Sequence, residues 1–181
     1  MNDFEFEQFV TALAFSAEKH RFERRKDRKR SAYINHPIQV TEALWKIGGV
    51  KDNHILTAAL LHDVLEDTDT KDSEIEAQFG QKVLGIVRGL TDDKSLPKEV
   101  RKRKQVETAS TKSLEAKTIK LADKISNVMD IRINPPGWCK KRKMEYIEWA
   151  REVVDQIRNT NLALERQFDE EYALTLAAIE K

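Results

Sequence analysis

The sequence predicts an all-α fold, a single-domain helical bundle formed by residues 1–181. No run of the chain alternates polar and apolar residues convincingly enough for a β-strand. Only 6 Gly and 4 Pro interrupt the chain, and they fall where helices are expected to begin or end. Apolar residues recur at helical spacing, for example in the stripe Ile119, Ala122, Ile125 and Met129.

Glycine and proline residues mark most of the expected helix boundaries. Pro37 suits the first position of a helix, the pair Gly48-Gly49 suits a helix end, and Gly80 separates two helices. Pro97 and the run Pro135-Pro136-Gly137 mark two further boundaries. The helices expected on this basis are residues 4–20, 37–47, 53–66, 73–79, 81–91, 97–110, 113–131 and 139–158, with a final helix at 160–180.

Three of these helices have further support in the side-chain pattern. Asp52 can cap the helix 53–66, and the apolar run from Ile55 to Leu61 predicts that this helix is buried. In the helix 37–47 we expect Leu44, Trp45 and Ile47 in the core. The helix 4–20 carries the apolar stripe Phe9, Val10, Leu13, Ala14 and Ala17.

The composition excludes several classes of protein. Hydrophobic residues make up 40% of the chain and charged residues 35%, with a net charge of +1, so wholesale disorder is excluded. The longest nearly apolar stretch has seven residues, whereas a membrane span needs roughly 20. A single cysteine, Cys139, excludes both an internal disulfide and a thiolate zinc site. The N-terminal segment is acidic where a secretory signal is basic, so we expect a cytoplasmic protein.

Positive charge is concentrated between His20 and Arg30, where seven basic residues accompany two acidic ones. A solvated helix flank is one interpretation of such a run. An anionic ligand is the second, because separated basic segments folded around one cleft focus a positive potential there. A nucleic-acid-binding module is a distant third, since the tryptophans and tyrosines are not interleaved with the basic residues.

The buried helix 53–66 ends in the polar sequence His62-Asp63-Val64-Leu65-Glu66-Asp67. Buried polar groups need hydrogen bonds, charge partners or a metal, because their desolvation is costly. Residues four apart on one helix share a face, which pairs His62 with Glu66 and Asp63 with Asp67. A His-Asp doublet alone is more often a hydrogen-bonded pair than a metal site.

Two other segments offer ligands of the same kind. His36 precedes Pro37 at the expected start of a helix, where a capping role is the simpler interpretation. Asp123 and Asn127 lie four apart on an amphipathic helix, where Asp123 is alternatively an exposed acid paired with Lys120 or Lys124. Together, two imidazoles and two carboxylates suit a six-coordinate divalent ion that keeps positions open for water, which is chemistry suited to attack on phosphorus.

These segments resemble the HD-domain phosphohydrolases, and most closely the Mesh1-like small alarmone hydrolases related to the hydrolase half of the Rel/SpoT enzymes. The resemblance runs from about residue 10 to residue 165. The matching segments are Arg25-Lys26-Asp27, 33–37, 58–63, Glu66-Asp67-Thr68, 90–94, 120–124 and 145–150.

The resemblance implies an all-α HD-domain fold with one Mn²⁺, and a water on that metal that attacks the 3′-pyrophosphate of guanosine tetra- or pentaphosphate to release pyrophosphate and GDP or GTP. The implied metal ligands are His36, His62, Asp63 and Asp123. Glu66 and Asp67 are implied to support the attacking water. The implied substrate contacts are Arg25, Lys26 and Asn127, with Tyr33, Lys98, Arg142 and Tyr146 as further contacts.

Several alternatives stay open at this point. Asp27 and Asp130 occupy positions where the long enzymes tend to carry small hydroxyl residues, so hydrolysis of adenosine alarmones is an alternative, as is an NADPH 2′-phosphatase activity. Another alternative is a silent scaffold that only binds nucleotide, although Glu66 and Asp67 are retained. The length leaves no room for a synthetase domain, and the sequence does not fix the oligomeric state.

Overall fold

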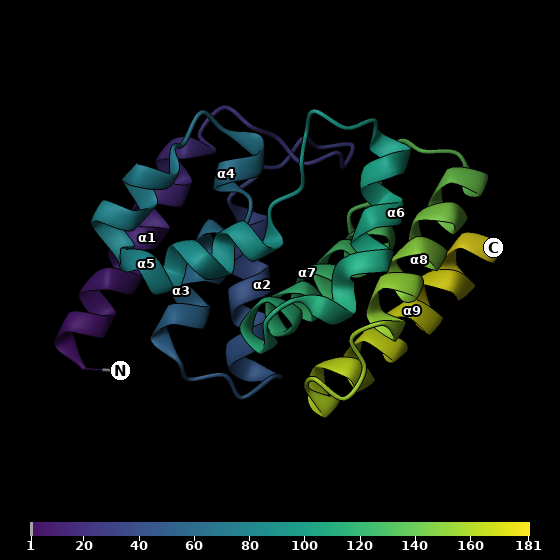
Figure 1. The fold of residues 1–181 in the computed structure, drawn as a ribbon. Coiled ribbons are helices and arrows are strands. Elements are labelled where there is room, and N and C mark those ends of the chain that lie inside the picture. Colours follow the sequence, from purple (N-terminus) through teal and green to yellow (C-terminus); the bar gives the residue numbers. More distant parts are fainter. Residues whose placement is uncertain (1) are drawn as a thin grey trace.

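The computed structural model describes residues 2–181, and over that part of the chain it is all-α, as predicted (Figure 1). Its only β-type pairings are the isolated bridges Arg24–Ala32 and Asp27–Pro136. The helices are α1 (Asp3–Lys19), α2 (Asn35–Lys46), α3 (Asn53–Leu61), α4 (Val64–Asp67), α5 (Asp72–Leu90), α6 (Lys98–Thr108), η1 (Ala109–Thr111), α7 (Leu114–Ile133), α8 (Lys140–Asp155) and α9 (Leu162–Glu180).

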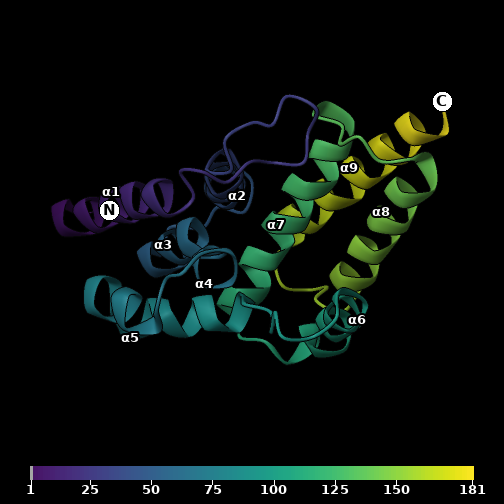
Figure 2. The ribbon, with the colours of Figure 1, turned by 90° about the horizontal axis from the view of Figure 1, so that it is seen from above.

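The helix α7 lies at the centre of the molecule. It packs against α2 and α5 of the N-terminal half and against α8 and α9 of the C-terminal half. Figures 1 and 2 show it between the purple and blue helices on one side and the yellow-green helices on the other. Twelve of its twenty residues are buried, including Lys120, Asp123 and Lys124, so polar groups of α7 lie inside the bundle. No helix in the described part of the chain is long and apolar enough to cross a bilayer.

Two predicted helix boundaries are wrong in an informative way. The helix expected at 53–66 is two helices, because α3 ends at Leu61 and α4 begins at Val64. His62 and Glu66 therefore do not lie on one face of a continuous helix, contrary to the prediction. The helix α2 begins at Asn35, so Pro37 is its third residue; a proline is tolerated there because the first amide groups of a helix have no intrahelical acceptor.

The other predictions about elements and core are mostly confirmed. Gly80 interrupts the helical conformation inside α5, with φ 84° and ψ 165°, where a break was expected. Asp52 caps α3 by accepting a hydrogen bond from the His54 amide at 2.7 Å. Leu44 is fully buried and Ile47 packs partly buried against the core, but Trp45 is 41% exposed, so its assignment to the core is wrong.

Candidate active site

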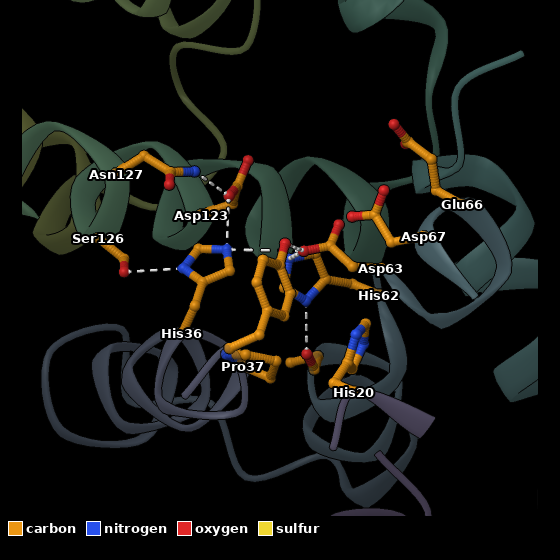
Figure 3. A network of polar contacts seen from close by, with 12 residues as sticks. His20, His36, Pro37, His62, Asp63, Glu66, Asp67, Asp123, Ser126 and Asn127 are labelled. Atoms are coloured by element: carbon orange, nitrogen blue, oxygen red, sulfur yellow. Dashed lines mark hydrogen bonds and ion pairs between the residues drawn. The ribbon is translucent and has the colours of Figure 1, made fainter. Parts of the chain in front are cut away.

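Three helical segments bring two imidazoles and two carboxylates together. His36 comes from α2, His62 follows α3, and Asp123 comes from α7; one ligand atom from each lies within 4.8 Å of the others. Asp63 lies beside them, with its Oδ2 atom 3.0 Å from His62 Nε2 and 3.8 Å from His36 Nε2. Figure 3 shows the four side chains converging between the helices. We call His36, His62, Asp63 and Asp123 the ligand group.

The far side of each imidazole is fixed by a hydrogen bond that leaves Nε2 facing the carboxylates. His62 Nδ1 donates to the carbonyl oxygen of Ala59 at 2.7 Å, since a carbonyl can only accept. Ser126 donates its hydroxyl to Gln39 and accepts from His36 Nδ1 at 3.0 Å. Partners of this kind orient metal-binding histidines in proteins.

The donor atoms of the ligand group and their contacts fit a divalent cation. His62 Nε2 is buried without a hydrogen-bond partner, because its 3.0 Å contact with Asp63 lacks hydrogen-bond geometry. His36 Nε2 lies 3.2 Å from Asp123 Oδ1. The Nε2 atoms of both histidines therefore face carboxylate oxygens across one buried space, where a divalent cation would offset the negative charge of Asp63 and Asp123. Imidazole and carboxylate donors are the set that suits a borderline divalent ion.

The electrostatics of the group reflect the same close packing of charges. Burial disfavours charged His62, but Asp63 and Asp123 outweigh burial and raise the pKa of His62 to about 9. For His36 burial dominates, and its pKa is lowered. Burial favours protonated Asp63, yet the neighbouring histidines hold the pKa of Asp63 well below its ordinary value. The carboxylates are therefore kept ionised, as metal ligands must be.

The carboxylates of Glu66 and Asp67, which follow the ligand group in the chain, have different partners and point in different directions. Glu66 accepts hydrogen bonds from the Asp92 amide at 3.0 Å and from Arg101 at 3.3 Å. Burial, together with Asp92 and Asp63, raises the pKa of Glu66 to about 6. Asp67 forms an ion pair with Lys94, and in Figure 3 its carboxylate points toward the ligand group, nearer than that of Glu66.

A cavity of about 500 Å³ opens over the ligand group, and we call it the large cavity. Burial, followed by repulsion from Lys98 and Arg142, lowers the pKa of Lys26 although Asp67 acts in the opposite direction. Every predicted site residue except His62 and Arg25 lines this cavity. They are Lys26, Tyr33, His36, Asp63, Glu66, Asp67, Lys98, Asp123, Asn127, Arg142 and Tyr146.

Arg25 lines a second, adjoining cavity of about 250 Å³, which we call the small cavity. Its guanidinium group donates to Asp130 at 2.8 Å and to Asn127 at 2.9 Å. Asn127 in turn donates to Asp123 Oδ1 at 2.5 Å. One polar chain therefore connects the small cavity to the ligand group, and six residues, including Lys26, Tyr33 and Asn127, line both cavities.

Sequence reasoning missed residues that support the predicted ones. His20 is buried, lies 2.7 Å from Glu23 through Nδ1, and its ring is 4.7 Å from that of Tyr33. Tyr33 then donates its hydroxyl to Asp63 at 2.5 Å. Arg101, which contacts Glu66, was also missed. Only a histidine at the end of a helix, next to the basic run, marked His20 in the sequence.

Comparison with known proteins supplies the family. The model of the HD domain matches residues 12–147. The chain belongs to the HD-domain family. Its Mesh1-like character is also shown, since this HD-domain chain is 50% identical over 159 residues to the human guanosine-3′,5′-bis(diphosphate) 3′-pyrophosphohydrolase MESH1, covering 87% of this chain and 89% of that protein.

Two further relatives agree with this assignment. The MESH1 protein of Drosophila melanogaster is 48% identical over 164 residues, covering 90% of this HD-domain chain and 92% of that protein. The solved structure of a metazoan SpoT ortholog that hydrolyses ppGpp and has a role in starvation responses superimposes with a TM-score of 0.89. It is 46% identical in sequence, and the match covers 92% of this chain and 94% of the other.

Proposed function

We propose that this chain, over residues 1–181, is an HD-domain enzyme that hydrolyses the 3′-pyrophosphate of guanosine tetra- and pentaphosphate with Mn²⁺, releasing pyrophosphate and GDP or GTP. The MESH1 relatives named for this activity support the reaction class. The observation that carries the proposal is the ligand group, in which His36 and His62 direct Nε2 toward two carboxylates beneath a cavity lined with cations.

His36, His62, Asp63 and Asp123 would hold the cation. A divalent metal in such a site supplies Lewis acidity and lowers the pKa of water. Asp67 faces the ligand group, so we assign to it the orientation of the attacking water. Glu66 has a pKa of about 6, close to the working pH, so we assign to it the uptake and return of a proton.

We assign a different part of the substrate to each of the two cavities. Lys26, Lys98 and Arg142 line the large cavity with positive charge, and we assign them to the phosphate groups. Arg25 and Asn127 meet in the small cavity, and we assign them to the nucleoside. Tyr33 and Tyr146 line both cavities, and we assign them to the junction between nucleoside and phosphates.

Part of the basic run is engaged within the protein, which favours a small ligand over nucleic acid. Arg25 is turned inward to Asp130, Lys26 lines both cavities, and Arg21 pairs with Glu18. A small nucleotide is therefore the partner that we propose. The single cysteine is consistent with the cytoplasmic location that we propose for the enzyme.

Release of pyrophosphate from guanosine tetraphosphate, measured with and without Mn²⁺, tests the proposal. We expect turnover that requires metal and is abolished in His62→Ala. His54 is an exposed histidine outside the site, so His54→Ala should keep the wild-type rate. A panel with adenosine alarmones and NADPH belongs to the same experiment, because release of orthophosphate from NADPH would indicate the phosphatase alternative. No turnover of any alarmone at saturating metal would exclude the proposal.

A further inference from the structure

Lys120 is a buried cation that the roles assigned above leave unused. It lies on α7 one turn before Asp123, is only 7% exposed, and lines the large cavity. Within the described residues, no hydrogen bond and no ion pair involves its ammonium group. Removing an ammonium group from water without a partner is costly, so a site that keeps one is normally completed by an anion.

Lys124, one turn further along α7, is a buried lysine whose ammonium group does have partners within the protein. It is 3% exposed, and its Nζ atom lies 3.1 Å from Asp123 Oδ2 and 4.3 Å from the centre of the Trp149 ring. These contacts satisfy Lys124 within the protein. Lys120 has neither kind of contact, although it lies on the same helix and lines the same cavity.

The carboxylates near Lys120 already have other partners. Asp123 Oδ1 is in contact with His36 and Asn127, and its Oδ2 atom with Lys124. Lys120 acts on Asp123 only at longer range, as one of the charges that hold the pKa of Asp123 well below its ordinary value against burial.

Three further acids that line the large cavity also have partners within the protein. Asp92 accepts a hydrogen bond from Gln105, and Glu66 accepts from the Asp92 amide and from Arg101. Asp67 pairs with Lys94. An anion that enters the cavity therefore meets in Lys120 a cation that need not first give up a protein partner.

We propose that Lys120 is a catalytic residue that binds the pyrophosphate group as it leaves, an inference that rests on the proposed function. Hydrolysis breaks the bond between phosphorus and the 3′-oxygen; the oxygen of water joins the phosphorus, and a proton passes to the 3′-oxygen. Lys120 keeps its own proton throughout. Its N–H groups donate hydrogen bonds to the phosphate oxygens and, together with Lys26, Lys98 and Arg142, offset their negative charge.

Binding of inorganic pyrophosphate to the Mn²⁺-loaded full chain, measured by calorimetry, tests this role. We expect Lys120→Met to weaken pyrophosphate binding at least tenfold without loss of bound metal, and Lys120→Arg to retain most of the affinity. Lys104→Met is the matched control, because Lys104 is exposed on α6 and does not line the cavity. It should bind pyrophosphate within twofold of the wild-type protein.

A second measurement on the wild-type protein covers the case in which Lys120→Met does not fold. Reductive methylation, followed by mass spectrometry, should label Lys120 at least fivefold more slowly when pyrophosphate is present, while labelling of Lys104 is unchanged. Equal affinity of Lys120→Met and the wild type, or labelling of Lys120 unaffected by pyrophosphate, would overturn the inference. Neither readout needs turnover, so failure of the proposed function would be recognised separately by the absence of alarmone hydrolysis.

Discussion

Glu66 and His62 lie four residues apart, yet the structure separates their tasks. His62 directs a buried Nε2 atom into the ligand group, whereas Glu66 is held by Asp92 and Arg101 at the facing wall. We therefore expect His62→Ala to lose both metal and turnover. Glu66→Gln should keep the metal and lower kcat by about 10²- to 10⁴-fold, the range typical of a lost proton-transfer group. Metal analysis of the purified variants, combined with kcat, checks this; metal loss in Glu66→Gln would show that ligand and catalyst have been exchanged.

The raised pKa of Glu66 predicts a specific dependence of the rate on pH. A base must be ionised, so kcat/KM should fall as the pH drops through about 6. The residual activity of Glu66→Gln should lack this step. The sign for stability is opposite: protonated Glu66 is favoured in the folded state, so wild-type stability from this group is lost as the pH rises through about 6. Thermal unfolding should therefore show Glu66→Gln to be at least as stable as the wild type at pH 8. If kcat/KM of the variant still falls below about pH 6 as it does in the wild type, the assignment of Glu66 as the base is wrong.

Tyr33 connects the ligand group to residues that the sequence did not single out. Its hydroxyl donates to Asp63 at 2.5 Å, and its ring packs 4.7 Å from that of His20. Tyr33→Phe removes the hydrogen bond and keeps the ring, so we expect Mn²⁺ affinity or activity to fall about 10- to 100-fold, as for other partners of metal ligands. Calorimetric titration with Mn²⁺ measures this. Tyr172→Phe is the control, because the Tyr172 hydroxyl bonds to Glu148 and does not line either cavity.

At the scale of helices, α5 carries a testable irregularity. Gly80 has φ 84° and ψ 165°, a conformation open essentially only to glycine, and a Cβ atom there would meet nothing within 4 Å. Gly80→Ala should therefore cost about 1–3 kcal/mol of unfolding free energy through backbone strain alone. Gly85 is helical in the same element and equally open, so Gly85→Ala should stabilise by about 0.5–1 kcal/mol. Urea unfolding compares the two variants; equal effects would contradict the argument.

The helices also show which structural features the local sequence could predict and which it could not. The break at Gly80 was predictable because glycine carries a local conformational preference. The break between Leu61 and Val64 was not, because neither glycine nor proline marks it in the sequence. Trp45 was assigned to the core from its type alone, but α1 and α3 leave part of it uncovered, with Lys51 over its ring at 3.1 Å. Which face a helix buries depends on neighbours that a single sequence does not position.

At the scale of the molecule, the convergence of the ligand group is the part that the residues alone could only suggest. Spacing identified His62 and Asp63 as a pair, but His36 and Asp123 lie 26 residues before and 61 residues after His62 in the chain. The resemblance to HD-domain phosphohydrolases supplied their association, and the packing of α7 against α2 and α3 brings them together. The contacts of Arg25 with Asn127 and Asp130, more than 100 residues away in the chain, likewise depend on tertiary packing.

This convergence predicts that metal binding stabilises the whole chain. The unfolded chain has no preformed site, so a cation at 100 times its Kd should add about 2.7 kcal/mol to the free energy of unfolding. For a protein of this length each kcal/mol raises Tm by about 2–4 °C, so saturating Mn²⁺ should raise Tm by roughly 5–10 °C. Calorimetric scans with Mn²⁺ and after chelation measure the shift. His62→Ala should show none, because its ligand group is incomplete, while His54→Ala should respond as the wild type does. A full shift in His62→Ala would mean that the stabilising cation binds elsewhere.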